Sequence, residues 1–238
     1  MTNIAFIPVR GDSKSIPLKN IKPLMMKPLV YWVTHAANDS TIIDKVVIAT
    51  DSEEIKQTVL SFNLPKVEVY ERDPKNAQDH SPTADVVLEY LNKFSYHDED
   101  LFFLLQATSP LTETQHITGL YEKMIADKAD SALSVAREKR FYWTEDGHPI
   151  NYDYNNRPRR QNFKGTLVEN GAIYCAQIRN IKKNNGVLLC DKVSVYEMPS
   201  YTTVEIDEPD DWLILEALMF KYKAYYPHLR KEREENDK

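Results

Sequence analysis

Short apolar runs recur along the chain, and segments with helical spacing lie between them. The runs are residues 4–9, 45–50, 67–70, 101–105 and 131–136. The first run has no polar alternation, which is typical of a strand buried on both faces of a parallel sheet. Residues 28–38, 53–62, 83–94 and 114–127 have the spacing of helices. Strands that alternate with helices predict βαβ units with right-handed crossovers, and therefore an α/β fold with a mostly parallel sheet.

The length of 238 residues suits one domain that covers the whole chain. After the alternating part, residues 172–177 and 193–198 return to strand character, and residues 209–222 have the spacing of a last long helix. The pattern breaks between residues 137 and 170, where Tyr, Asn, Arg and Pro are frequent. This segment predicts loops and hairpins that leave the core.

Composition limits the partners and the compartment. The formal net charge is −6, which argues against a nucleic-acid partner. The chain has only two cysteines, Cys175 and Cys190, and their spacing is not that of a metal site, so free thiols in a reducing cytoplasm are expected. We see no signal peptide, membrane span or lipidation motif, and we therefore expect a cytoplasmic protein without a membrane partner.

A basic loop follows the first apolar run. It contains Arg10, Gly11 and Lys14, and Lys19 comes soon after. Open α/β sheets bind their ligands at the carboxyl ends of strands. Glycine lets the backbone approach a ligand closely, and the cations supply charge for a polyphosphate. The alternative is a solvated basic turn, since neither the P-loop nor the dinucleotide pattern is present.

This loop resembles the N-terminal signature of the CMP-sialic acid synthetases, which are also called acylneuraminate cytidylyltransferases. The family signature reads roughly A-R-G-G-S-K-G-I-P-x-K-N, and residues 9–20 here read V-R-G-D-S-K-S-I-P-L-K-N. Further segments match in the family's order, so the resemblance covers nearly the whole chain. It implies a three-layer, Rossmann-like nucleotide-sugar transferase fold. It also implies an enzyme that joins CTP to a nonulosonic acid, giving a CMP-sugar and pyrophosphate.

The resemblance implies a set of nucleotide contacts. It places Arg10 and Lys19 on the triphosphate of CTP. Residues 71–83 resemble the family loop R-P-x-x-L-A-x-D-x-x-S-S, which meets the base and the ribose. The alternative for this segment is a polar surface loop in which Thr83 is a helix N-cap. The implied nucleotide-binding residues are Arg10, Gly11, Ser13, Lys14, Lys19, Asn20, Arg72 and Thr83.

Three segments are implied to meet the sugar acid. Residues 106–111 read Q-A-T-S-P-L and resemble the family's Q-P-T-S-P-L-R. Residues 157–161 resemble P-R-(R/Q)-Q, where an arginine can grip a carboxylate through two hydrogen bonds; a solvated basic run is the alternative. Residues 170–174 read N-G-A-I-Y, as in the family. The implied substrate contacts are Gln106, Thr108, Ser109, Arg159 and Asn170.

An acidic segment close to the last helix resembles the family's I-D-I-D-T-x-x-D. Residues 204–212 read V-E-I-D-E-P-D-D-W. Glu205 and Asp207 alternate, so an extended chain places both carboxylates on one side, where they suit Mg²⁺. The alternative is an acidic cluster at a helix start, with Asp207 or Glu208 as the cap. Both interpretations can be correct if Glu205 and Asp207 bind the metal ion while Asp210 and Asp211 stabilise the start of the helix.

The resemblance completes the prediction. It implies that Arg10, Lys19 and Asp207 act in catalysis, that Mg²⁺ is the cofactor and that residues 137–170 project to form a homodimer. Asp12 and Val168 depart from the family pattern. These departures keep open a sugar-nucleotide-binding protein without catalytic activity. A CMP-Kdo synthetase is a second alternative, because it shares the fold.

Overall fold

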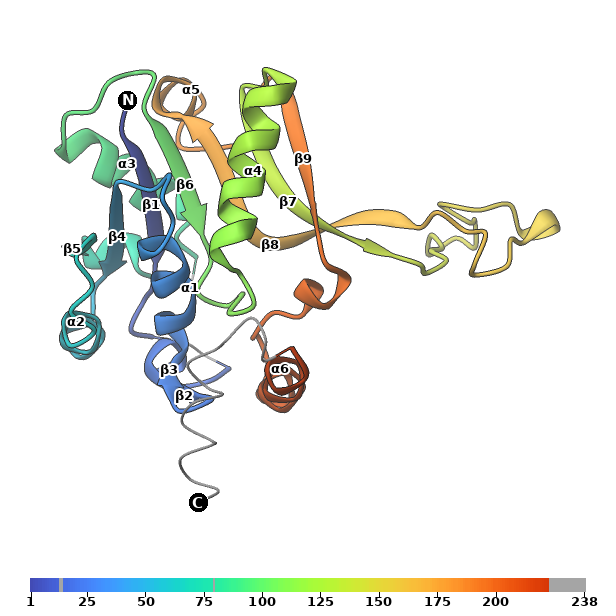
Figure 1. The fold of residues 1–238 in the computed structure, drawn as a ribbon, viewed down its shortest axis with the longest axis horizontal. Coiled ribbons are helices and arrows are strands. Elements are labelled where there is room, and N and C mark those ends of the chain that lie inside the picture. The colour runs from blue at the N-terminus through green and yellow to red at the C-terminus, as the bar shows by residue number, and fades with distance from the viewer. Residues whose placement is uncertain (13–14, 79, 223–238) are drawn as a thin grey trace.

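The computed structural model describes residues 1–12, 15–78 and 80–222. Figure 1 shows a central sheet between helices, with a long arm that leaves the sheet on one side. The sheet has seven strands in the order β5-β4-β1-β6-β8-β7-β9. They are β1 (Asn3–Pro8), β4 (Lys45–Thr50), β5 (Val67–Glu71), β6 (Leu101–Leu105), β7 (Ser131–Glu138), β8 (Thr166–Gln177) and β9 (Val193–Met198).

All strands of this sheet run in one direction except β8. The pairs β1–β4, β1–β6, β4–β5 and β7–β9 are parallel. β8 lies between β6 and β7 and is antiparallel to both. The prediction of a mostly parallel sheet is therefore confirmed.

Helices cover both faces of the sheet, which gives three layers. They are α1 (Leu29–Asn38), α2 (Glu53–Leu60), α3 (Thr83–Lys93), α4 (Thr114–Asp127), α5 (Ile178–Lys183) and α6 (Pro209–Lys221). Ala5 and Ile7 of β1 pack in one apolar cluster with α1, α2 and α4. Ile4 and Phe6 pack on the other face with α3 and α5. Because neighbouring strand residues point to opposite faces, this double burial explains the unbroken apolar run.

Several short elements were not predicted. They are α5, the hairpin of β2 (Pro23–Leu24) and β3 (Lys27–Pro28), and the 3₁₀ helices η1 (Lys19–Ile21), η2 (Pro74–Asn76), η3 (Tyr154–Asn156) and η4 (Ser200–Thr203). Each is too short to show a period in the sequence. α6 packs away from the sheet, against the hairpin and the start of α1, in a third apolar cluster that includes Ile206 and Trp212.

Helix starts decide two alternatives that the sequence left open. α3 begins at Thr83 with Pro82 in the cap position, and no side chain caps it. The N-cap interpretation of Thr83 is therefore wrong. α6 begins after Glu208, whose side chain forms a reciprocal capping box with Asp211. Asp207 is thus not the cap, because the backbone enters the helix one residue later.

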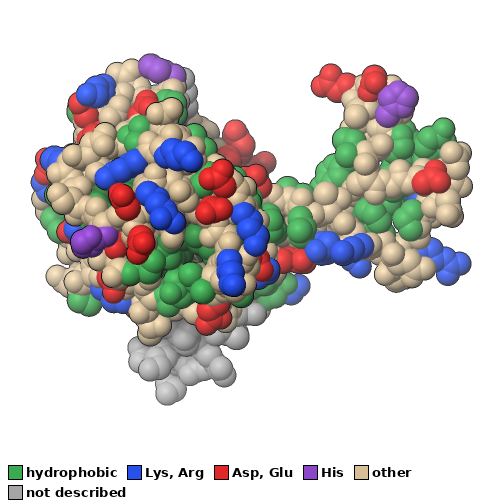
Figure 2. Space-filling view, turned by 90° about the horizontal axis from the view of Figure 1, so that it is seen from above, with side chains coloured by type: hydrophobic (Ala, Val, Ile, Leu, Met, Phe, Trp, Pro, Cys, Tyr) green, Lys and Arg blue, Asp and Glu red, His purple; other side chains and the backbone are tan. Residues whose placement is uncertain are grey.

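The arm consists of residues 139–165 and stands apart from the body (Figures 1 and 2). The residues on either side of the arm belong to strands β7 and β8, since Arg137 pairs with Leu167 and Glu138 with Thr166. The predicted excursion of residues 137–170 is therefore shorter than expected. Inside the arm, the ring centroids of Phe141 and Tyr152 lie 4.2 Å apart, and Arg157 stacks over Phe141.

Two predictions from composition can be compared with the structure. Cys175 and Cys190 are both free thiols, and Cys175 is buried. None of the helices in the described part of the chain combines the length and the apolar character that crossing a membrane requires.

Candidate active site

The sheet order places a ligand crevice at the carboxyl ends of β1 and β6. The chain runs from β1 to β4 and β5 on one side, and then returns to β6 on the other side. Connections that leave in opposite directions from neighbouring strands open a crevice at this point. A pocket lies there, and it is lined by Pro8, Arg10, Lys19, Asn20, Arg72, Gln78, Ser81, Thr83, Val86, Gln106, Ala107 and Thr108.

This pocket brings together seven predicted site residues. They are Arg10, Lys19, Asn20, Arg72, Thr83, Gln106 and Thr108. Arg10, Lys19 and Arg72 are cations, and no acidic residue occurs among the described residues of the lining. Ser13 and Lys14 lie outside the described residues. An anionic ligand therefore suits the pocket.

Hydrogen bonds within the protein hold the first loop. Asn20 is buried, and its Nδ2 donates to the Arg10 carbonyl oxygen at 3.1 Å. The Gly11 N–H donates to Asp51 Oδ1 at 3.0 Å. A β-carbon on Gly11 would lie 3.0 Å from the Ser52 Cβ, so glycine permits close approach to the β4–α2 turn.

Arg72 places a buried guanidinium in the pocket wall. The residue is 8% exposed, and its Nη2 donates to the Asn76 carbonyl oxygen. Its Nε has no hydrogen-bond partner among the described residues. Burial lowers the pKa of Arg72, while the charges of Asp51 and Glu89 oppose this effect. A buried N–H group without a partner is suited to an anionic ligand.

Glu89 of α3 holds the loop that carries Arg72. Its Oε1 accepts from the Tyr70 hydroxyl at 2.6 Å and from the Asp73 N–H at 2.9 Å. Its Oε2 accepts from Asn76 Nδ2 at 2.6 Å. Burial raises the pKa of Glu89, but these hydrogen bonds outweigh it and leave the pKa below its usual value.

Hydrogen bonds join the acidic segment to Lys19, which is predicted to bind nucleotide, and to Thr108, which is predicted to bind the sugar acid. Lys19 Nζ donates to the Ile206 carbonyl oxygen at 2.8 Å and lies 3.4 Å from Asp207 Oδ1. The Ile206 N–H donates to the Thr108 carbonyl oxygen at 2.9 Å. The Lys19 side chain is 12% exposed, whereas that of Asp207 is 73% exposed. Asp207 is therefore accessible to a ligand.

Glu205 lies beside Asp207 and over Gly171. A β-carbon on Gly171 would lie 2.7 Å from Glu205 Oε1, and the φ of this glycine is +62°. Burial raises the pKa of Glu205, the charge of Asp207 raises it further, and Lys19 opposes both. Within the described part of the chain, no group of three or more His, Cys, Asp and Glu residues is arranged to hold a metal ion.

The remaining predicted sugar contacts lie in different surroundings. Ser109 is 3% exposed, and its hydroxyl has no partner among the described residues. Asn170 is 1% exposed, and its amide is bonded to protein groups. Arg159 is exposed on the arm and does not line the pocket of its own chain.

Sequence reasoning missed four residues of the site. Gln78 and Ser81 line the pocket from within the predicted base-binding segment. Asp51 and Glu89 act behind the pocket, on Gly11 and on the Arg72 loop. Asp51 could have been found, because it directly follows an apolar strand. Glu89 gives no such signal, since it is one of several polar residues of an amphipathic helix.

The family can now be assigned. The model of a family described as "Cytidylyltransferase" matches residues 4–213. The chain belongs to this family. It is 36% identical over 225 residues to N-acylneuraminate cytidylyltransferase A of Danio rerio, and the match covers 92% of this chain and 51% of that protein. It is 27% identical over 232 residues to a pseudaminic acid cytidylyltransferase of Campylobacter jejuni, with 94% and 97% coverage.

The length and the fold of the relatives complete the comparison. The chain spans about half the length of the N-acylneuraminate cytidylyltransferases that it matches. The fold is similar to that of a CMP:2-keto-3-deoxy-manno-octonic acid synthetase solved in complex with CTP. The TM-score is 0.69 at 19% identity, and the match covers 93% of this chain and all of that one. The Rossmann-like nucleotidyltransferase fold that the resemblance implied is confirmed.

Glu89→Gln should destabilise the protein in a pH-dependent way. The substitution removes a carboxylate that accepts three hydrogen bonds, so we expect a loss of about 1–3 kcal/mol in the free energy of unfolding at pH 7. The folded pKa of Glu89 is lowered, so its contribution is complete above the unfolded pKa of about 4.3 and is lost as the pH falls through the folded value. Urea unfolding at pH 7, 5 and 3.5 measures the difference.

Asp85→Asn is the control for this experiment, because Asp85 is an exposed carboxylate of the same helix. It should change the free energy of unfolding by about 0.5 kcal/mol or less. A Glu89→Gln variant as stable as the wild type at pH 7, or equally destabilised down to pH 3.5, would contradict the assignment.

Proposed function

We propose that this chain joins CTP to a nonulosonic acid of the sialic type, giving a CMP-sugar and pyrophosphate. The observation that carries the proposal is the pocket at the ends of β1 and β6, where Arg10, Lys19 and Arg72 converge in a chain of the cytidylyltransferase family. The relatives named for N-acylneuraminate and pseudaminic acid support the choice of acid.

In this proposal, the first loop binds the triphosphate. Arg10 and Lys19 lie along the phosphates, and the family resemblance assigns Ser13 and Lys14 to the same role. They stabilise the charge on the departing pyrophosphate, which is the main electrostatic demand of the reaction. Asn20 and Gly11 keep the loop in shape through their bonds to Arg10 and Asp51.

The segment of residues 71–83 binds the cytosine and the ribose. Arg72 lines the pocket with Gln78, Ser81 and Thr83. Thr83 does not cap its helix, so its hydroxyl is available to a ligand. Short hydroxyl and amide groups donate and accept hydrogen bonds without bulk, which suits the edge of a base.

The sugar acid lies against Gln106, Thr108 and Ser109. Its anomeric hydroxyl oxygen forms the new bond to the α-phosphorus of CTP. The bond from that phosphorus to the oxygen of the β-phosphate breaks, and pyrophosphate leaves with the bonding electrons. The hydroxyl proton passes to water, so the products are the CMP-sugar, pyrophosphate and a proton. Positioning of the two substrates supplies much of the rate in chemistry of this kind.

Mg²⁺ fits the acidic segment. The charge of Asp207 helps to raise the pKa of Glu205, and Lys19 is the nearby cation, so a further cation is favourable there. Mg²⁺ commonly uses one or two carboxylates together with water and phosphate oxygens. Glu205 and Asp207 would hold the ion, which would supply charge to neutralise the phosphates and to lower the pKa of the attacking hydroxyl.

A homodimer and a cytoplasmic location complete the proposal. The arm projects from the body and leaves Trp143, Ile150 and Tyr154 exposed. Figure 2 shows Lys and Arg side chains along the arm, and Lys139, Arg140, Arg157 and Arg160 line one hollow there. We propose that Arg159 meets the carboxylate of the sugar acid in the second subunit. The free thiols support a reducing compartment.

CTP should be strongly preferred over UTP, ATP and GTP. A wrong base leaves hydrogen-bonding groups of the pocket without partners, at about 1–3 kcal/mol per group. Release of pyrophosphate with each nucleotide measures the preference, and a panel of N-acetylneuraminic, legionaminic, pseudaminic and Kdo acids identifies the sugar. Equal turnover with UTP would contradict the proposal. Absence of turnover with every acid would favour a non-catalytic binding protein, and turnover with Kdo alone would favour the CMP-Kdo synthetase.

Asp207→Asn should abolish most of the activity and leave the fold intact. The change removes a charged ligand for Mg²⁺, and we expect turnover to fall about a hundredfold or more, as a loss of about 3 kcal/mol of transition-state stabilisation implies. The helix cap is unaffected because Glu208 and Asp211 supply it. Turnover at several Mg²⁺ concentrations and thermal unfolding are the measurements. Asp210→Asn, an exposed acid of the same segment, is the control and should stay near wild type.

The protein should be a dimer in solution. The exposed apolar side chains of the arm would be covered in a two-fold assembly, which removes them from water. Light scattering should give a mass of about twice the 27.6 kDa of the chain. A 27.6 kDa species at working concentration, with rapid trypsin cleavage at residues 157–160, would show instead a monomer with an accessible arm.

A further inference from the structure

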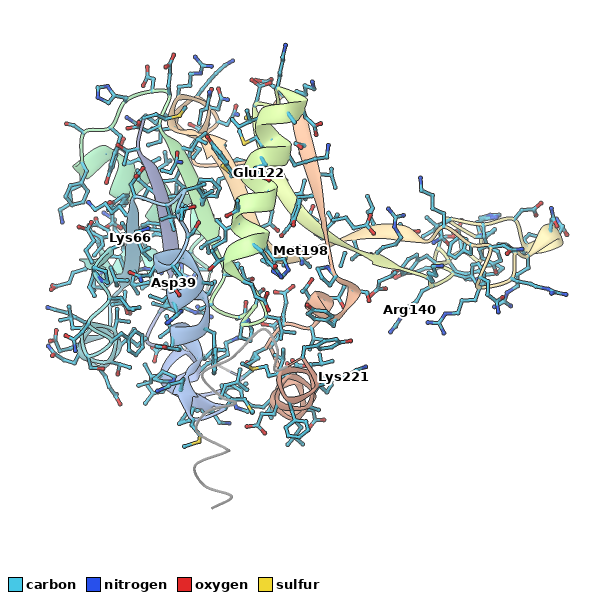
Figure 3. All side chains as sticks on the ribbon, viewed as in Figure 1. Asp39, Lys66, Glu122, Arg140, Met198 and Lys221 are labelled. Carbon is cyan, nitrogen blue, oxygen red and sulfur yellow. The ribbon has the colours of Figure 1, made fainter. Side chains whose placement is uncertain are left out.

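Asn170 has a buried amide whose two ends are bonded to different parts of the protein. Its Oδ1 accepts from the Ser134 hydroxyl at 2.7 Å. Its Nδ2 donates to the Thr202 hydroxyl oxygen at 2.9 Å and contacts Met198 Sδ at 3.4 Å. Asn170 therefore joins β7, the end of β9 and η4. Figure 3 shows Met198 close to the point where the arm leaves the sheet.

An irregularity in the sheet turns Asn170 inward. Leu133 pairs with Tyr174 and Val135 pairs with Glu169, so the register shifts between them. Residues 170–173 form the irregular part of β8, and the Ile173 N–H donates to the Ser134 hydroxyl oxygen at 2.9 Å. Such irregularities re-aim side chains, and they are frequent beside active sites.

The same irregularity faces the acidic segment. Thr202, which Asn170 contacts, lies three residues before Glu205, and its hydroxyl donates to the Pro199 carbonyl oxygen at 2.8 Å. Gly171, the neighbour of Asn170, leaves room for the Glu205 carboxylate. Asn170 thus holds the chain that precedes Glu205, and its neighbour Gly171 leaves the space that the Glu205 side chain fills.

We infer that Asn170 is a positioning residue, which acts through Thr202 to set the place of Glu205 and Asp207. Its amide is 1% exposed and bonded at both ends, so a substrate does not reach it. Its position behind the acidic segment suits a group that orients ligands. The part of this inference that concerns metal binding rests on the proposed function, whereas the placement of the segment does not.

Thr202→Val tests the placement directly. It is nearly isosteric and removes the hydroxyl that accepts from Asn170 and donates to Pro199. We expect the Ile206 amide, whose N–H is bonded to Thr108, to exchange with deuterium roughly tenfold faster, because the two hydrogen bonds of the Thr202 hydroxyl are lost. Exchange in β1 and β4 should stay unchanged. Thr202→Ser keeps the hydroxyl and should restore slow exchange.

Thr203→Val is the matched control. Thr203 follows Thr202 in η4, and its hydroxyl donates to the Ser200 carbonyl oxygen at 2.9 Å, but it does not contact Asn170. It should exchange like the wild type at Ile206. Unchanged exchange at Ile206 in Thr202→Val, or equal acceleration in Thr203→Val, would overturn the inference.

A titration with MnCl₂ alone, followed by the electron paramagnetic resonance signal of free Mn²⁺, tests the consequence for metal binding. Thr202→Val should bind Mn²⁺ roughly tenfold more weakly than wild type, and Thr202→Ser should not, because one hydrogen bond sets the place of both carboxylates. If Thr202→Val shows fast exchange at Ile206 but the wild type binds no Mn²⁺, the positioning role holds and the proposed metal site fails. Equal Mn²⁺ binding by Thr202→Val and wild type would overturn the link from Asn170 to the metal.

Discussion

The peptide group of Ile206 is the interaction on which the site depends. Its N–H is bonded to the Thr108 carbonyl oxygen, and its own carbonyl oxygen accepts from Lys19. The side chain of Ile206 is completely buried in the cluster with Trp32 and Trp212. Because side chains alternate along an extended chain, burial of Ile206 turns Glu205 and Asp207 to the other side. Apolar packing thereby fixes the direction of two carboxylates, and the peptide group fixes their distance from both substrate loops.

Two carboxylates near the pocket support its cationic wall while they are bonded to other protein groups. In a chain with a net charge of −6, the described residues of the pocket lining include three cations and no acid. Asp207 lies beside Lys19, whereas Asp51 and Glu89 are bonded to protein groups. Asp51 accepts from Gly11, and Glu89 is occupied by Tyr70, Asp73 and Asn76. Their charges favour the ionised form of Arg72 from a distance. They offset the cost of a buried guanidinium without neutralising it by contact.

The sequence predicts what depends on burial and fails where three-dimensional hydrogen bonding decides. Residues 45–50 and 101–105 coincide with β4 and β6, because strands buried on both faces need unbroken apolar runs. The switch point and the family motifs then predict most of the pocket lining. The sequence leaves the cap of α6 ambiguous, since Asp207 and Glu208 are equally good candidates until the backbone path is known. Asn170 was predicted to bind substrate because a motif identifies a residue without showing what its side chain contacts.

The contact of Lys19 with the acidic segment also sets the order in which the site is assembled during translation. The residues of the Lys19–Asp207 pair are 188 positions apart. A ribosome adds about 5–20 residues per second, so the acidic segment is made about 10–40 s after the basic loop. Throughout this interval the nascent chain has the basic loop but lacks Glu205 and Asp207. The two halves of the site meet only after all seven strands of the sheet have been synthesised.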